Sequence, residues 1–131
     1  MVSAFARQIA AIEKGIQEPV ILVGNMETKR DFTDVRDIVS AYQLIIEKGT
    51  IGEVYNIGRG VSYKIADILD KLLALSTREI TVKIDETRLR PSDTPELICD
   101  NRKLISVTNW QPKYSIEETV KNILDYWRNI V

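Results

Sequence analysis

Arginine and aspartate side chains are crowded into residues 29–37, which read KRDFTDVRD. This segment lies between an apolar run at residues 20–23 and the start of a predicted helix at Val35. A guanidinium group binds two closely spaced anionic oxygens at once, and a helix start adds backbone donors and a favourable dipole. The cluster is therefore a candidate site for a diphosphate.

The same cluster has a second interpretation that involves no ligand. Arg30, Asp31, Arg36 and Asp37 could form a network of surface ion pairs, which is a common arrangement of mixed charges. Their spacing does not separate the two interpretations, so both stay open at this stage.

A second polar cluster follows at residues 88–93, which read RLRPSD. Pro91 restricts the backbone of Arg90 to extended conformations, which would hold that side chain in a defined direction. Asp93 can accept hydrogen bonds from ribose hydroxyls or from a base edge. A solvated loop without a ligand is the alternative.

Several kinds of catalytic chemistry lack their residues in this chain. It contains no histidine, which excludes His-based catalytic triads. None of its six glycines forms the glycine-rich turn of dinucleotide-binding folds, and no tyrosine precedes a lysine by four residues. The one cysteine, Cys99, follows two apolar residues and is expected to be a buried, inert thiol. We therefore expect the chain to bind rather than catalyse on its own.

The composition excludes some partners. A net charge of -1 over 131 residues leaves no basic surface of the kind that nucleic-acid binding needs. The apolar runs are far shorter than the roughly 20 residues of a membrane-spanning helix, so no membrane contact is expected. The first residues lack the layout of a secretory signal, which predicts a cytoplasmic protein.

Apolar periodicity alternates between the helical and the extended kind along the chain. Asp34 and Gly49 are placed to cap the second helix, and Ser115 with Glu118 forms a capping box before the last one. Ser62 and Asp100 are expected to cap the two helices between them. The predicted helices cover residues 2–16, 35–46, 65–73, 103–107 and 116–131. The predicted strands cover residues 20–23, 53–58 and 80–84, the last of them half-buried.

This alternation predicts an α/β fold in a single domain of residues 1–131, with a small, mostly parallel sheet and flanking helices. The apolar stripes of the helices are expected to form the core. A sheet of only three strands leaves much of its edge unpaired. We therefore expect these strands to complete a larger sheet whose other strands come from outside these residues.

Four motifs in a fixed order give the chain a family resemblance. They are residues 24–37 (GNMETKRDFTDVRD), 54–58 (VYNIG), 90–93 (RPSD) and 108–112 (TNWQP). Together they resemble the C-terminal, substrate-binding half of extended short-chain dehydrogenases that act on nucleotide sugars. Within that group, the wording RDFTDVRD resembles the GDP-4-keto-6-deoxymannose reductases.

This resemblance implies a function for the whole protein. It implies reduction of a GDP-bound 4-keto sugar by NAD(P)H to give GDP-rhamnose, with the cofactor bound by a Rossmann domain upstream of these residues. The catalytic tyrosine and lysine would lie in that missing domain, so whether this chain counts as an enzyme is left open. No cofactor is expected to bind to this chain alone, and a homodimer is one possible assembly.

The resemblance also assigns roles to individual residues. Arg30 would bind the diphosphate, and Asn25 would help to line the nucleotide site. The pair Arg90 and Asp93 would hold phosphate and ribose or base. Asn56 and, on the first helix, Arg7 complete the predicted set: Arg30, Arg90, Asp93, Asn25, Asn56 and Arg7.

Two other function classes remain beside the reductase. A GDP-mannose 4,6-dehydratase or another nucleotide-sugar epimerase or dehydratase would share the nucleotide site and differ in the catalytic loop. A non-catalytic interaction module would instead pair with a separate Rossmann chain, or with itself, through exposed strand edges.

Overall fold

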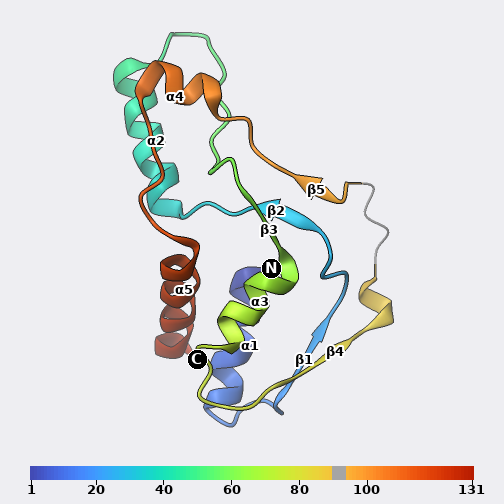
Figure 1. The fold of residues 1–131 in the computed structure, drawn as a ribbon. Helices are drawn as coiled ribbons and strands as arrows, with labels where there is room; N and C mark the ends of the chain where they lie inside the picture. The colour runs from blue at the N-terminus through green and yellow to red at the C-terminus, as the bar shows by residue number, and fades with distance from the viewer. Residues whose placement is uncertain (90–93) are drawn as a thin grey trace.

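The computed structural model describes residues 1–89 and 94–131 and arranges them as helices around two small sheets (Figure 1). The helices are α1 (Val2–Glu13), α2 (Val35–Lys48), α3 (Ile65–Leu73), α4 (Arg102–Thr108) and α5 (Ile116–Ile130), with a 3₁₀ turn η1 (Glu86–Arg88). The strands are β1 (Val20–Val23), β2 (Lys29–Asp31), β3 (Ser62–Lys64), β4 (Thr81–Ile84) and β5 (Glu96–Leu97).

The strands pair in two separate groups. In the first, β1 runs parallel to β4, with Val20 opposite Thr81. In the second, β2 lies in the centre, antiparallel to β3 and parallel to β5. Two of the three strand pairs are thus parallel, which confirms the predicted α/β class with mostly parallel pairing and flanking helices.

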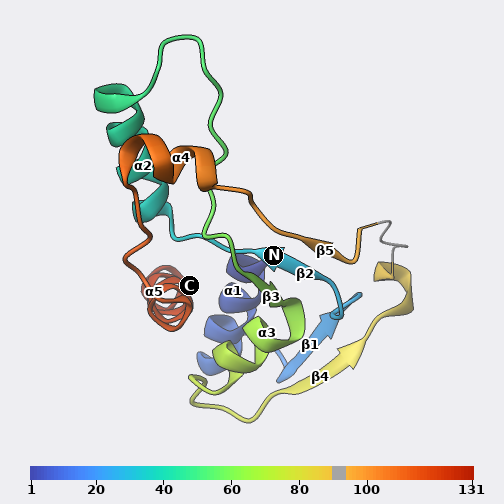
Figure 2. The same cartoon turned by 45° about the horizontal axis from the view of Figure 1, so that its top comes forward.

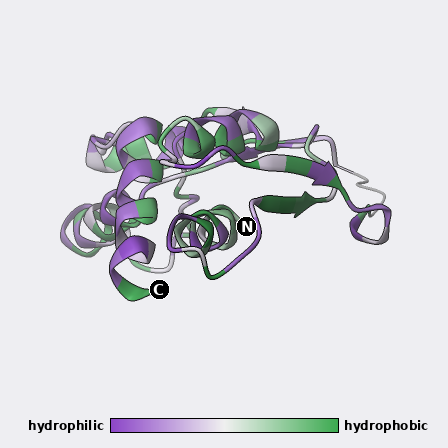
Figure 3. Ribbon diagram, turned by 90° about the horizontal axis from the view of Figure 1, so that it is seen from below, coloured by the Kyte–Doolittle hydropathy of each residue, from purple (hydrophilic) through white to green (hydrophobic). Residues whose placement is uncertain are grey.

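The main core lies between α1, α3, α5 and β1, and we call it the three-helix core. In Figures 1 and 2 these three helices lie side by side, with β1 and β4 to one side of them. Figure 3 shows hydrophobic and hydrophilic segments alternating along the helices, as expected when each helix buries one face. The buried members of the three-helix core are Phe5, Ala6, Ile9, Ile12, Ile21, Val23, Ile65, Ile68, Leu69, Leu72, Ile116, Val120 and Leu124.

A second, smaller core joins α2 to α4 at the other end of the molecule, and we call it the α2–α4 core. Its buried members are Ala41, Leu104 and Trp110. Partly buried side chains from α2 and from residues 55–57 pack around them. Three buried residues leave much of the apolar surface of α2 uncovered.

Helix α2 therefore corrects the expectation that every apolar stripe is core. Val35 is 70% exposed and Ile46 is 86% exposed, and Val39 and Tyr42 on the same face are more than half exposed. The helix meets the α2–α4 core instead through Ala41, Leu44 and Ile45. Within residues 1–89 and 94–131, nothing buries the outer stripe.

Two strand predictions need correction. Residues 53–58 form no strand, because they have no strand partner in the described part of the chain, and Tyr55 and Ile57 pack instead against the α2–α4 core. Strand β4 forms as predicted but is exposed along its whole length rather than half-buried, because among the described residues β1 is its only strand neighbour.

The helix ends follow the capping predictions in part. Asp34 and the Ser115–Glu118 capping box are confirmed, and Gly49 ends α2 as predicted. Ser62 caps no helix, because it lies in β3, where its hydroxyl donates to the Glu96 carboxylate, and α3 begins only at Ile65. Asp100 lies one residue before the cap position of α4, and its carboxylate accepts from the backbone N–H of Arg102.

Among the described residues, no helix combines the length and the apolar character that crossing a bilayer requires.

Candidate functional site

A groove of about 800 Å³ opens beside β2, between residues 55–58 and the segment that leads from β5 to α4. Two of the predicted site residues, Arg30 and Asn56, line it. They lie on segments 26 positions apart in the chain, and the fold brings them into the same concave surface. The groove is the candidate site.

Arg30 is held in the groove by the central strand of the second sheet. It pairs with Tyr63 of β3 on one side and with Leu97 of β5 on the other. Its side chain is half-buried, and its Nη1 atom donates to the carbonyl oxygen of Lys29 at 2.7 Å. A guanidinium group fixed on a paired strand is better suited to hold an anion than one on a loop.

The part of the groove formed by Asn56, Cys99 and Asp100 carries polar and acidic groups. The side-chain amide of Asn56 lies 3.5 Å from the carbonyl oxygen of Asp100. Hydrogen bonds from Arg102 lower the pKa of Asp100 to about 2, so its carboxylate is ionised at neutral pH and paired with a cation. Cys99 is half-buried rather than buried as predicted, and burial is the main reason that the pKa of its thiol is raised.

The carboxylate of Asp31 connects this wall to β2. Its Oδ1 atom accepts from the backbone N–H of Arg59 at 3.0 Å, and its Oδ2 atom accepts from those of Gly60 at 2.8 Å and Cys99 at 3.2 Å. The Thr33 hydroxyl donates to the same carboxylate. Three separate segments of the chain, namely β2, residues 59–60 and the segment around Cys99, thus meet at the Asp31 side chain.

Thr33 of the 29–37 cluster also lines the groove, whereas Asp34, Arg36 and Asp37 do not and instead support the structure. The Asp34 carboxylate caps α2 and pairs with Arg36, whose hydrogen bonds hold the pKa of Asp34 well below its ordinary value. The guanidinium of Arg36 lies 3.6 Å from the ring centre of Tyr114. Asp37 is buried and accepts from the backbone N–H groups of Lys113 and Tyr114. The cluster therefore contains the ion pair Asp34–Arg36, and its binding of a diphosphate stays a prediction.

The other predicted residues lie elsewhere. Asn25 lines a separate hollow beside the first turns of α1, where its side-chain oxygen accepts from the backbone N–H of Glu27. The guanidinium of Arg7 lies 5.7 Å from the ring centre of Trp127 on α5 and does not line the groove. Arg90 and Asp93 fall outside the described residues, and their roles stay predictions.

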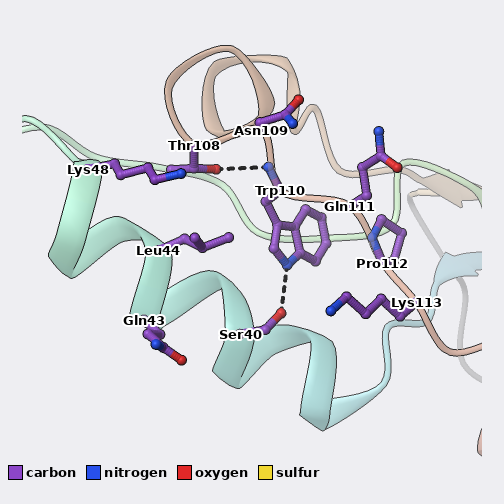
Figure 4. Close-up of a pocket in the computed structure, with 10 residues that line it drawn as sticks. All are labelled: Ser40, Gln43, Leu44, Lys48, Thr108, Asn109, Trp110, Gln111, Pro112 and Lys113. Atoms are coloured by element: carbon purple, nitrogen blue, oxygen red, sulfur yellow. Dashed lines mark hydrogen bonds between the residues drawn. The ribbon is translucent and has the colours of Figure 1, made fainter.

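The motif at residues 108–112 has a packing role in this structure. The indole N–H of Trp110 donates to Ser40, and its backbone N–H donates to Thr108 (Figure 4). The indole N–H also donates to the carbonyl oxygen of Asp37. The hollow around it, between α2 and α4, contains none of the predicted site residues. Trp110 thus joins α4 to α2 rather than contributing to the groove.

Some groove residues escaped sequence reasoning. Ile38 and Tyr42 on α2 and the run from Leu97 to Asp100 line the groove, yet their types and spacing indicate packing or a helix cap. Asp31 was part of the cluster, but its tie to Cys99 spans 68 residues, and no local pattern reveals such a contact. No group of three or more metal-binding side chains occurs among the described residues.

Comparison with known proteins agrees with this architecture. GDP-6-deoxy-D-mannose reductase of Pseudomonas aeruginosa is 30% identical over all of this chain, which covers 43% of that protein. The structure of RMD from Pseudomonas aeruginosa complexed with NADPH matches 99% of this chain and 43% of its own, with a TM-score of 0.93. UDP-glucose 4-epimerase of Thermotoga maritima with UDP-glucose matches 98% of this chain and 39% of its own, at 30% identity and a TM-score of 0.77.

These matches show that the chain is a member of the extended short-chain dehydrogenases, in the NAD-dependent epimerase and dehydratase group. Within that class it belongs to the GDP-mannose 4,6 dehydratase family, whose family model matches residues 1–123. The chain spans about two fifths of the length of the Pseudomonas aeruginosa reductase and of a GDP-6-deoxy-D-talose 4-dehydrogenase from Aggregatibacter actinomycetemcomitans.

Proposed function

We propose that this chain is the substrate-binding domain of an NAD(P)H-dependent GDP-4-keto-6-deoxymannose reductase, and that its groove holds the GDP-sugar. The observation that carries the proposal is the similarity to GDP-6-deoxy-D-mannose reductase along the entire chain. A GDP-6-deoxy-D-talose 4-dehydrogenase from Aggregatibacter actinomycetemcomitans is also 30% identical over 95% of this chain. Both names describe oxidation or reduction of a GDP-bound 6-deoxy sugar.

The groove supplies binding groups of the right kind for such a ligand. The Arg30 guanidinium would pair with the diphosphate, while Asn56 would offer an amide to the ribose or the sugar. Because Asp100 is already paired with Arg102, the wall adds little net negative charge against an anionic ligand. Asn25 and Arg7, which do not line the groove, and Arg90 and Asp93, which fall outside the described residues, are proposed to contribute to the nucleotide site as well.

The cofactor would not be held by these residues. The 131 residues contain no glycine-rich turn of the kind that cradles a dinucleotide, so no hydride-transfer step is assigned to them. In the proposed whole protein, NAD(P)H supplies the hydride, and this chain binds and orients the sugar that receives it.

A dehydratase or an epimerase is the second candidate. The family model is that of GDP-mannose 4,6 dehydratase, and a UDP-glucose 4-epimerase of Caenorhabditis elegans is 32% identical over 74% of this chain. The preferred base of the nucleotide distinguishes a UDP-glucose epimerase from the proposed reductase, because such an epimerase would prefer UDP over GDP.

Calorimetric titration of the chain with GDP and with UDP tests the proposal. We expect GDP to bind more tightly than UDP. Replacing Arg30 by Ala should cost about 2–5 kcal/mol of GDP affinity if the guanidinium pairs with a desolvated diphosphate. Arg78→Ala removes the same charge from an exposed site outside the groove and should leave the affinity unchanged. Equal affinity in the Arg30→Ala variant would refute the assignment.

A further inference from the structure

The carboxylate of Asp31 is the point at which the two sides of the groove are joined. Residues 55–58 and the segment around Cys99 have no strand pairing with each other in the described chain, although both line the groove. Backbone N–H groups from the loop after residue 58 and from Cys99 converge on the two oxygens of this one side chain. A carboxylate is suited to this task because it accepts several hydrogen bonds at once.

The same junction is closely packed. A Cβ atom added at Gly58 would lie 2.3 Å from the Cβ of Cys99 and 3.1 Å from Oδ2 of Asp31. The side-chain amide of Asn101 donates to the carbonyl oxygen of Gly58 at 2.8 Å, which adds a second tie between the two segments. The spacing of the groove walls therefore depends on a small set of contacts that surround Asp31.

We propose that Asp31 is a positioning residue: by holding the 58–60 turn and Cys99 against β2, it sets the positions of residues 55–58 and of the segment around Cys99 relative to Arg30 and thereby controls nucleotide affinity. This inference rests on the proposed function for the identity of the ligand. Asp31 itself need not touch the ligand, since its two oxygens already accept from protein groups.

Asp37 offers a matched control within the same motif. Its carboxylate also accepts from two backbone N–H groups, those of Lys113 and Tyr114, and it does not line the groove. Asp31→Asn and Asp37→Asn each keep the side-chain shape and replace one acceptor oxygen by a donor. Both variants should lose stability, but only Asp31→Asn should loosen the groove.

The experiment measures GDP affinity by calorimetry, thermal stability, and amide hydrogen exchange of the ligand-free chain. For Asp31→Asn we expect faster exchange at Arg59, Gly60 and Cys99 and a loss of GDP affinity of about tenfold. For Asp37→Asn we expect faster exchange at Lys113 and Tyr114 and GDP affinity within about twofold of the wild type.

A second variant covers the case in which Asp31→Asn does not fold. In Gly58→Ala the added methyl group would collide with Cys99 and should force the same two segments apart. This variant should therefore also lower GDP affinity about tenfold. Unchanged affinity in both groove variants, or a loss of equal size in Asp37→Asn, would overturn the inference. If the wild type bound neither GDP nor UDP, the proposed function would fail, and the exchange rates at Gly60 and Cys99 would still decide whether Asp31 joins the walls.

Discussion

The three-helix core and the α2–α4 core are built from similar helices but differ in how completely they bury them. Helices α1, α3 and α5 cover one another and β1, and the first core has thirteen buried members. Helices α2 and α4 share only three, while Val39 and Ile46 on the far side of α2 are exposed. The groove lies on the second of these regions, since Ile38 and Tyr42 of α2 line it.

This difference shows that an apolar stripe predicts a helix face but not the surface that covers it. Apolar residues recur at helical spacing in both α2 and α5, and the three-dimensional contacts decide how far each stripe is buried. Because buried area supplies most of the stabilisation of a packed helix, we expect α2 and α4 to open more readily than the three-helix core.

The largest effect is expected from Trp110→Ala, which would sharpen this contrast. The indole is 1% exposed and fills the centre of the α2–α4 core, so its removal should cost about 3–5 kcal/mol of unfolding free energy. Amide hydrogen exchange should show lost protection in α2 and α4, with α1, α3 and α5 still protected.

Leu124→Ala in the three-helix core is the control for that experiment. It should cost about 2–5 kcal/mol and reduce protection throughout the chain, because this core supports the remaining elements. A uniform loss of protection in both variants would mean that the two cores unfold as one unit, which contradicts the comparison.

A smaller effect is expected from the ion pair that ties α1 to α5. The Glu13 carboxylate accepts from Nε and Nη2 of Arg128, each at 2.7 Å, and from the backbone N–H of Thr77 at 2.9 Å. The hydrogen bond from Arg128 is the main reason that the pKa of Glu13 is lowered. Glu13→Gln should cost about 1.5–3 kcal/mol of unfolding free energy at pH 7.

The stabilisation by the Glu13 carboxylate should decrease as the pH falls. A carboxyl group whose pKa is lower in the folded state stabilises the fold above its unfolded pKa, and that stabilisation is lost as pH falls through the folded value. The difference between wild type and Glu13→Gln should therefore shrink below about pH 4.3, as followed by urea denaturation. The exposed Glu79→Gln serves as control, and a similar pH-dependent difference in it would refute the local explanation.

Local chemistry was enough to predict most of the elements and part of the site. The Asp34 cap, the Ser115 capping box and the β1 run each depend on neighbouring residues, which is why they were predictable. Whether residues 53–58 pair as a strand depends on which backbone lies beside them, and residue spacing does not reveal that. The same holds for the groove: Arg30 stood out by its type, whereas the role proposed for Asp31 depends on its contacts with Arg59 and Cys99.

The smallest effect on folding is expected on the outer face of α2. Lysine has a higher helix propensity than valine or isoleucine, and both Val39 and Ile46 are more than half exposed in the described chain. The double variant Val39→Lys and Ile46→Lys should therefore change the unfolding free energy by no more than about 0.5 kcal/mol. Urea denaturation measures this change.

Ala41→Lys is the matched control, because it places the same side chain on the buried face of the same helix, where the native residue has no exposed surface. Forcing a charge into the α2–α4 core should cost several kcal/mol or unfold that region. If the outer-face variant instead lost more than about 1 kcal/mol, the stripe must be covered in solution, and light scattering at rising concentration would show whether a second copy of the chain covers it.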